Sequence, residues 1–294
     1  MRHRIEYALV RLLAGLLRWL PRRAACGLAR FCARLLDRFV PRLRRVARRN
    51  LELVMPELAP DELERLIDGV FRSVAGVLVA IARFPSIDRG NVHEWIRYEG
   101  SEHYQEARRR GRGVLFATAH LGNWELSAFA HALMAEPMHV VVRPLDNPLL
   151  DAWAERRRRF SGNRVVGKKD AARGILRALA ANEAVGILID QNTSPQEGVF
   201  VDFFGVKACA HAGFARLAAR SGAVVIPGFA LWSPGESRYV LRFYPPLPMT
   251  GDAATDTQRL HAHLESVIRE YPDQWLWIHR RWKTRPEGEP PIYL

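Results

Sequence analysis

The sequence predicts an α/β fold, with a single mixed, largely parallel sheet flanked by helices and a basic helical N-terminal extension. Beyond Pro85, short segments rich in Val, Ile and Phe alternate with segments of helical periodicity. The strand-like segments are continuously apolar, which is typical of strands covered on both faces. With 294 residues, 48% of them hydrophobic, the chain is long enough for a large core, and this composition excludes a disordered or collagen-like protein.

The first part of the chain, residues 1–85, is expected to be entirely helical. Pro21 ends a first helix, and in the helix expected from about Asp61 to Arg83 the apolar residues recur at four-residue steps. Two further helices are expected between these, at 24–40 and after Pro41. We interpret residues 1–85 as a basic, membrane-associating region and residues 86–294 as the α/β domain.

The second part contains the predicted sheet. The expected strands are 114–119, 139–144, 184–190, 223–232 and 239–245. The expected helices are 123–135, 148–160, 170–181, 211–221 and 256–270. Because no helix separates the last two strands, we expect that pair to be antiparallel.

Positive charge is concentrated at the N-terminus. Residues 1–49 contain fourteen arginines and two acids, Glu6 and Asp37, a net of +12 out of +13 for the whole chain. Such an asymmetry indicates a region that meets an anionic surface, either lipid headgroups or nucleic acid. Leucine rather than base-stacking aromatic residues alternates with these arginines, and no nucleic-acid motif is present. We therefore expect no nucleic-acid partner, and a basic nucleic-acid-binding module is the distant alternative.

The first helix is amphipathic. Arg4, Arg11 and Arg18 fall within one narrow arc, and leucines occupy the opposite side. Its longest run without a charge, 12–17, is too short to span a bilayer. This pattern favours a helix in the headgroup plane; the alternative is a helix packed on its own domain. A signal peptide is not favoured, because Arg11 and Arg18 interrupt its apolar core.

One strand end carries a candidate catalytic pair. His120 immediately follows the strand 114–119, Gly122 and Asn123 open the next helix, and Glu125 falls in its first turn. We expect Glu125 to orient the imidazole of His120, which would act as general base for a hydroxyl. Free backbone amides at the helix start are expected to favour developing negative charge. The alternative is that His120 is a structural residue.

Competing catalytic motifs are absent from the sequence. There is no G-x-S-x-G elbow, phosphate-binding loop or H-E-x-x-H motif. No covalent nucleophile is evident, which favours direct attack by an activated substrate hydroxyl. The three cysteines, Cys26, Cys32 and Cys209, form no C-x-x-C pair, so we expect neither a disulfide framework nor a metal site.

Several segments of the chain, taken in order, resemble motifs of a known family. AHLGNWE (119–125) is similar to the first motif of the lysophospholipid acyltransferase superfamily, H-x4-D/E. Within that superfamily the chain resembles the bacterial lipid A biosynthesis acyltransferases, the late lauroyl and myristoyl transferases. The segments that carry this resemblance are RRNLELVMPEL (48–58), VVRPLDNPLLD (141–151), ILIDQN (187–192), GVFVDFFG (198–205), AVVIPGFA (223–230) and YPDQWLWIHRRWKTRP (271–286).

The resemblance implies a glycerolipid-acyltransferase-like fold and transfer of a fatty acyl chain from acyl carrier protein to a hydroxyl of an acylated lipid A precursor. It implies His120 as base and Glu125 as its partner, and it matches Arg143 and Asp190 to family residues at strand ends. We expect Asn123, Arg143 and Asp190 to bind substrate; the alternatives are a surface ion pair for Arg143 and a polar sheet-end residue for Asp190. No cofactor is expected beyond the phosphopantetheine thioester of the carrier. The expected location is the cytoplasmic face of the inner membrane, reached through a monotopic or single N-terminal anchor. Another glycolipid or an aminolipid acceptor, with acyl-CoA as donor, is the alternative.

Several side-chain groups are compatible with these partners. Arginine clusters at 42–49, 108–112 and 156–159 are suited to steer anionic partners. Trp275, Trp277 and Trp282, beside the cations of 279–283, are suited to a membrane interface. A further aromatic group, Phe200, Phe203 and Phe204, fits either an acyl channel or ordinary core packing.

Overall fold

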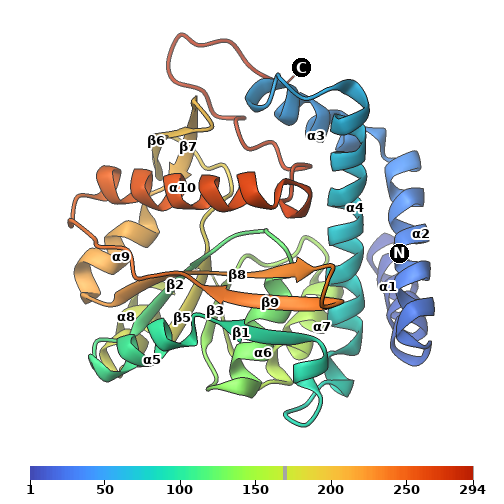
Figure 1. Ribbon diagram of the computed structural model, residues 1–294, viewed down its shortest axis with the longest axis horizontal. Helices are drawn as coiled ribbons and strands as arrows, with labels where there is room; N and C mark the ends of the chain where they lie inside the picture. The colour runs from blue at the N-terminus through green and yellow to red at the C-terminus, as the bar shows by residue number, and fades with distance from the viewer. Residues whose placement is uncertain (168–170, 294) are drawn as a thin grey trace.

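The main sheet lies at the centre of a computed structural model that describes residues 1–167 and 171–293 (Figure 1). Within those residues the sheet has seven strands in the order β1-β9-β8-β2-β5-β3-β4. All neighbouring strands are parallel except β8 and β9, which are antiparallel. The strands are β1 (Ile96–Glu99), β2 (Val114–Thr118), β3 (His139–Val142), β4 (Arg164–Gly167), β5 (Ala184–Leu188), β8 (Val224–Ser233) and β9 (Arg238–Phe243). The predicted single, mixed, largely parallel sheet is confirmed, including its antiparallel final pair.

Helices surround this sheet. Those of the α/β part are α5 (Ser101–Arg109), α6 (Trp124–Met134), α7 (Pro148–Arg159), α8 (Ala171–Ala180), α9 (Gly213–Ser221) and α10 (Ala253–Glu270). Short 3-10 turns occur at η1 (Phe84–Ser86), η2 (Val92–Glu94) and η3 (Pro272–Gln274). The predicted helices correspond to these elements, except that residue 170, the expected start of one of them, lies outside the described residues.

Four helices form the N-terminal part: α1 (Arg2–Trp19), α2 (Arg22–Phe39), α3 (Pro41–Val54) and α4 (Pro60–Arg83). Helices α1 and α2 lie along one side of α4, whose other contacts include α6 and α7 (Figure 1). Buried apolar residues form one continuous core from Ala14 of α1 to Trp282 near the C-terminus. The division at residue 85 coincides with η1, where the chain changes from helices alone to alternating strands and helices, and it stays a prediction about domains.

Several short elements were missed by the sequence analysis. They include helix α5, the edge strands β1 and β4, and the antiparallel hairpin of β6 (Gly198–Phe203) and β7 (Val206–His211). Phe204 and Gly205 connect the hairpin with positive φ at both residues, 56° and 74°. This is the two-residue turn that matches the twist of paired strands. Edge strands of four residues leave too little periodicity to be recognised in a sequence.

The C-terminal aromatic residues correct one expectation. Trp275, Trp277 and Trp282 are all buried, and their rings contact Phe203 and Phe204 of the hairpin. They form core between α10, the hairpin and the C-terminal segment, so they do not meet a membrane. Burial of large aromatic surface is the stronger driving force here, and the sequence alone did not show that the hairpin folds over these rings.

Candidate active site

Strand register brings His120 and Asp190 together. Thr118 at the end of β2 pairs with Leu188 at the end of β5. His120 lies two residues beyond Thr118, and Asp190 lies two residues beyond Leu188. The Nδ1 atom of His120 lies 2.9 Å from Oδ1 of Asp190. Residues equally far beyond two paired strands are neighbours, because parallel strands end at the same edge of the sheet.

Asp190 is held by three donors. The backbone N–H of His120 and the indole Nε1–H of Trp275 each donate to Oδ2 at 2.9 Å, while the imidazole binds Oδ1. The aspartate is only 3% exposed. Burial raises the pKa of the Asp190 carboxyl, but the charge of His120 and these hydrogen bonds outweigh burial and lower it. Asp190 is therefore a fixed carboxylate that positions the ring of His120.

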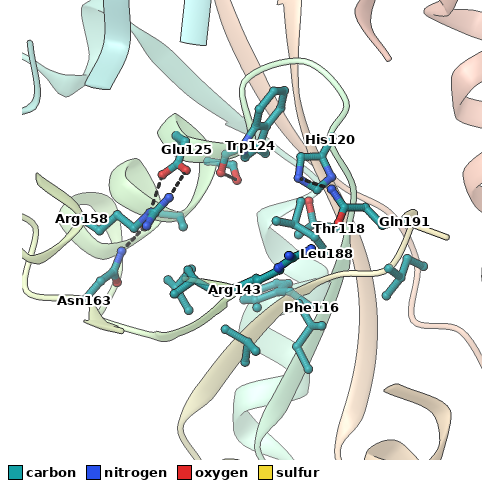
Figure 2. A pocket seen from close by; sticks show the side chains of 18 of the residues that line it. Phe116, Thr118, His120, Trp124, Glu125, Arg143, Arg158, Asn163, Leu188 and Gln191 are labelled. Atoms are coloured by element: carbon teal, nitrogen blue, oxygen red, sulfur yellow. Dashed lines mark hydrogen bonds and ion pairs between the residues drawn. The ribbon is translucent and has the colours of Figure 1, made fainter. Parts of the chain in front are cut away.

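The opposite ring nitrogen of His120 faces the cavity. Nε2 lies 3.5 Å from the amide Nε2 of Gln191, and the ring of Trp124 packs edge-on against the imidazole with 5.0 Å between centroids (Figure 2). Burial lowers the pKa of His120, but the charge and hydrogen bond of Asp190, with a smaller contribution from Glu125, raise it above its ordinary value. A carboxylate on Nδ1 leaves Nε2 to exchange a proton with a bound molecule.

The segment between His120 and α6 is fixed by distant parts of the chain. Gly122 donates to the carbonyl of Gln274 and Asn123 to that of Ala230, at 2.9 and 2.8 Å, and Leu276 donates to the carbonyl of His120. Gly122 has φ +63°, and a Cβ atom there would lie 2.0 Å from the Ala230 carbonyl oxygen. Because these amides are already bonded, the expected supply of free N–H groups for negative charge is not met by Gly122 or Asn123.

Asn123 is the N-cap of α6. Its Oδ1 accepts from the N–H of Leu126 at 3.1 Å, and its Nδ2 donates to the carbonyl of Gly76 at 3.3 Å. The side chain is fully buried, and Asn123 is not among the residues that line the cavity. The expectation that it binds substrate is therefore not met by its placement: capping and the contact with α4 use both ends of the amide.

Glu125 does not make the contact expected of it. Both of its carboxylate oxygens accept from Arg158 of α7, at 2.9 and 2.6 Å (Figure 2). The carboxylate on the imidazole is that of Asp190 instead. Glu125 lies in the first turn of α6, where its side chain reaches α7, and a bidentate arginine is a stronger partner than an imidazole. Its charge still acts on His120 through space, so its catalytic role stays a prediction.

One large cavity of about 1140 Å³ lies beside these groups. Its walls are mainly apolar side chains from α1, α4, α6, α7 and the central strands, among them Val10, Leu78, Phe116, Val140 and Trp153. His120, Glu125 and Arg158 lie in its wall. An apolar cavity that ends at a few convergent polar groups is the usual form of a binding site for a mostly apolar ligand.

Two further polar groups reach the same cavity. Arg143 follows β3, and Figure 2 shows its side chain passing beneath His120 between Phe116 and Leu188. It forms no ion pair or side-chain hydrogen bond with any described residue. The hydroxyl Oγ1 of Thr118 is buried and has no hydrogen-bond partner within the described part of the chain. Both are available to a bound molecule.

Comparison with known proteins shows which family the chain belongs to. A family model described as bacterial lipid A biosynthesis acyltransferase matches residues 1–284. The chain belongs to this family. It is 32% identical over 274 residues to the lipid A biosynthesis lauroyltransferase of Escherichia coli K12, covering 92% of this chain and 88% of the relative. It is also similar to the palmitoleoyltransferase of the same organism, at 32% over 87% and 84% of the two chains, and to its myristoyltransferase, at 27% over 86% and 80%.

Membership in the lipid A acyltransferase family confirms the resemblance carried by the motifs and makes the chain an acyltransferase of lipid A biosynthesis. The matched region contains every predicted site residue, from His120 to Asp190. None of the helices in the described ranges combines the length and hydrophobicity needed to cross a bilayer.

Sequence reasoning missed two members of the site. Arg158 was placed in a cluster suited to steering anionic partners, and Trp275 at a membrane interface, yet one binds Glu125 and the other binds Asp190. Asp190 was predicted to bind substrate, and the structure places it on the imidazole of His120, a contact for which the sequence did contain a signal. Both His120 and Asp190 follow apolar strands directly, so the parallel sheet itself places them together.

Proposed function

We propose that this acyltransferase moves a fatty acyl chain from acyl carrier protein to a hydroxyl of an acylated lipid A precursor, at the cytoplasmic face of the inner membrane. The observation that carries the proposal is His120, held by Asp190, in the wall of a mainly apolar cavity. The names of its relatives support the class of acceptor. The donor's thioester is substrate, and the proposal involves no resident cofactor.

In the proposed reaction, Nε2 of neutral His120 takes the proton of the acceptor hydroxyl as its oxygen attacks the thioester carbonyl. The C–S bond then breaks, an ester forms, and the departing thiol sulfur takes the proton back from His120. Asp190 holds the ring and stabilises the transient imidazolium through Nδ1. No acyl group is carried by the protein, since the acceptor oxygen attacks directly.

Other cavity residues have proposed roles in the same reaction. The unpaired guanidinium of Arg143 is suited to a phosphate of either substrate. The unpartnered hydroxyl of Thr118 is suited to donate a hydrogen bond to the thioester carbonyl oxygen beside His120. Glu125, locked by Arg158, is proposed to add negative charge that favours the imidazolium.

The N-terminal helices support attachment to a lipid surface. Ile5, Leu9, Leu12 and Leu16 of α1 are 47% to 64% exposed, and Trp19 is 81% exposed. A stripe packed on its own domain would bury these side chains, so the exposed stripe favours the headgroup-plane alternative. Val10 of the same helix lines the cavity. A lipid acceptor held at this surface would therefore be close to the cavity entrance.

The test is acyl transfer by the purified full-length protein. It is incubated with a tetra-acylated lipid A precursor and acyl carrier proteins loaded with C10 to C16 chains, and the product is analysed by mass spectrometry. We expect the mass of one acyl chain to be added, and His120→Ala to reduce the rate by a factor of about 10³ or more at unchanged thermal stability. Transfer only from acyl-CoA, only to another glycolipid, or at full rate in His120→Ala would contradict the proposal.

A further inference from the structure

One part of the cavity lies away from α1 and α2. Its wall there consists of residues from α8 and α9: the apolar Ile175, Phe214 and Leu217, and the basic Arg216 and Arg220. Helices α8 and α9 pack together at the side of the sheet opposite to α1 and α2 (Figure 1). A ligand could therefore approach His120 from this side without crossing the exposed apolar stripe of α1.

This face is positively charged, and none of the acids in the described residues pairs with its arginines. Helices α8 and α9 contain four arginines and no acid: Arg173, Arg177, Arg216 and Arg220. None of the four forms an ion pair or side-chain hydrogen bond with a residue of the described ranges. Arg216 and Arg220 are one helical turn apart, an arrangement of like charges that is destabilising in an isolated helix. No acid in the described ranges therefore matches their charge, which suits an external anionic partner.

The arginine clusters identified from the sequence differ from this face. Arg44 pairs with Asp37, Glu64 and Asp68, Arg108 pairs with Glu136, and Arg158 pairs with Glu125. Arginines whose charge is matched inside the fold contribute little to steering a partner. Long-range attraction of an anion to the α/β part therefore depends on its unpaired arginines, and four of these lie together on α8 and α9.

The character of the surface favours a water-soluble partner over a membrane. Every large hydrophobic residue of α8 and α9 whose side chain the structure describes is at least partly buried. A membrane-binding surface needs apolar side chains that enter the lipid, and those are found on α1 and α2. A basic, polar rim around an apolar opening matches an acidic protein that presents an acyl chain.

We propose that the α8–α9 face, centred on Arg216 and Arg220, is the docking surface for the acidic protein that carries the acyl group. The acyl-bearing arm enters past Ile175, Phe214 and Leu217 and reaches His120 from the side opposite to the lipid acceptor. This inference rests on the proposed function, because it assumes an acidic carrier as donor. Two anionic substrates then use different entrances to one cavity.

The experiment compares two donors that share the same thioester. One is acyl carrier protein loaded with a C12 chain, and the other is the same chain on pantetheine, which has neither the protein nor the phosphate. In Arg216→Glu/Arg220→Glu we expect the ratio of kcat/KM for the carrier to kcat/KM for the pantetheine donor to fall about tenfold or more, through KM for the carrier. In the wild type, added salt should raise that KM.

The matched control is Arg72→Glu/Arg89→Glu. It reverses two charges that are also exposed and unpaired among the described residues, but neither residue lines the cavity. Its donor ratio should equal that of the wild type. If Arg216→Glu/Arg220→Glu does not fold, Arg216→Gln/Arg220→Gln should show a smaller fall in the ratio and a weaker salt dependence.

Each contrary outcome has a separate meaning. An unchanged donor ratio in a wild type that uses the carrier would overturn the docking surface and leave the proposed function intact. A rise in KM for the lipid acceptor, with KM for the carrier unchanged, would assign the arginines to a lipid phosphate and also overturn it. A wild type that accepts only the small donor or acyl-CoA would contradict the proposed donor, and the docking surface with it.

Discussion

The imidazole of His120 is controlled by a carboxylate from a neighbouring strand end rather than from its own loop. Three donors keep Asp190 ionised, and Asp190 in turn favours the protonated ring. A general base must be neutral to accept a proton. The same contact that orients His120 therefore also sets the pH below which it cannot act.

Asp190→Asn tests this control. Because the Asp190 charge raises the pKa of His120, wild-type kcat/KM should fall as pH drops through a value above 6.5, the ordinary pKa of histidine. Replacing the carboxylate removes that effect, so the acidic limb of the pH profile should move to lower pH, and the maximal rate should fall by a factor of about 10² to 10⁴. The measurement is kcat/KM from pH 5 to 9, with the exposed Asp202→Asn as control. An acidic limb that stays in place would refute the assignment.

The pair of Glu125 and Arg158 should behave as a buried ion pair. Its side chains are 13% and 16% exposed, and each loses its partner when the other is changed. We expect Glu125→Gln and Arg158→Gln each to lower the free energy of unfolding by about 2–4 kcal/mol, and the double variant to cost less than their sum. Urea unfolding of the wild type, the two single variants and the double variant completes this double-mutant cycle and measures the coupling between the two side chains.

A neighbouring pair on α7 supplies the control for this cycle. Glu155 and Arg159 are 38% and 57% exposed and lie four residues apart, so their equivalent variants should change stability by less than about 0.5 kcal/mol. Additive costs for Glu125 and Arg158 would show that the two side chains do not depend on one another.

At this scale the sequence predicted which strand ends carry chemistry, and it could not predict which side chains touch. His120, Arg143 and Asp190 each follow an apolar strand directly, and the structure places all three at the same edge of the sheet. The direction of Glu125 depends on the rotation of α6 and on the position of α7, neither of which periodicity determines. The contact with Trp275 joins residues 85 positions apart, for which no local pattern exists.

Among the elements, the turn between β2 and α6 is tightly constrained. Gly122 combines a positive φ with a close approach to the Ala230 carbonyl of β8. Gly222, at the end of α9, has nearly the same φ, +64°, but open space where a Cβ would lie. Both glycines need a positive φ, and only Gly122 also needs the absence of a Cβ atom. A comparison of the two therefore distinguishes the cost of backbone strain from the cost of a steric clash.

Replacing each of these glycines by alanine gives a matched test. Gly222→Ala should lower the free energy of unfolding by about 1 kcal/mol, the cost of holding an alanine at positive φ. Gly122→Ala should lower the free energy of unfolding by clearly more than this. It should also lower the acyl transfer rate, because the loop that carries His120 has to move. Thermal unfolding and activity are measured for both variants. Equal stability losses would show that the contact with β8 is unimportant.

Elements with a clear period were predictable, and short or locally ambiguous ones were not. The expected strand at 184–190 and helix at 256–270 correspond to β5 and α10 within a few residues, because each has continuous burial or a full amphipathic pattern. The segment of β6 and β7 was recognised only as a family motif. Its folding as a hairpin over the tryptophans depends on tertiary packing, which overrides local preference.

The whole molecule presents two different surfaces on opposite sides of one sheet: an apolar and basic one on α1 and α2, and a polar and basic one on α8 and α9 (Figure 1). The asymmetry of charge along the sequence predicted the first surface. It did not reveal the second, because four arginines among 294 residues are not unusual until the structure shows that they form no ion pair among the described residues.

Membrane association through α1 is testable at this scale. Leu12→Ser/Leu16→Ser should weaken binding to vesicles that contain anionic phospholipid at least tenfold, since each exposed leucine loses about 1.5–3 kcal/mol of potential burial. Vesicle flotation measures the bound fraction. Phe200→Ser removes a partly exposed aromatic from the β6–β7 hairpin and serves as the control. Equal binding by the α1 variant and the wild type would contradict attachment through this helix.

The segment 274–276 forms hydrogen bonds with the loop of His120 and with Asp190, and this affects when the protein becomes active during its own synthesis. Gln274, Trp275 and Leu276 bond to Gly122, Asp190 and His120, so the reactive ring has no fixed orientation until that segment has left the ribosome and folded back. A nascent or prematurely terminated polypeptide would carry the complete histidine motif and still lack an ordered base. Such a chain would not modify lipids while unfinished, and enzymatic competence would begin only after residues 274–276 have been made and have folded back.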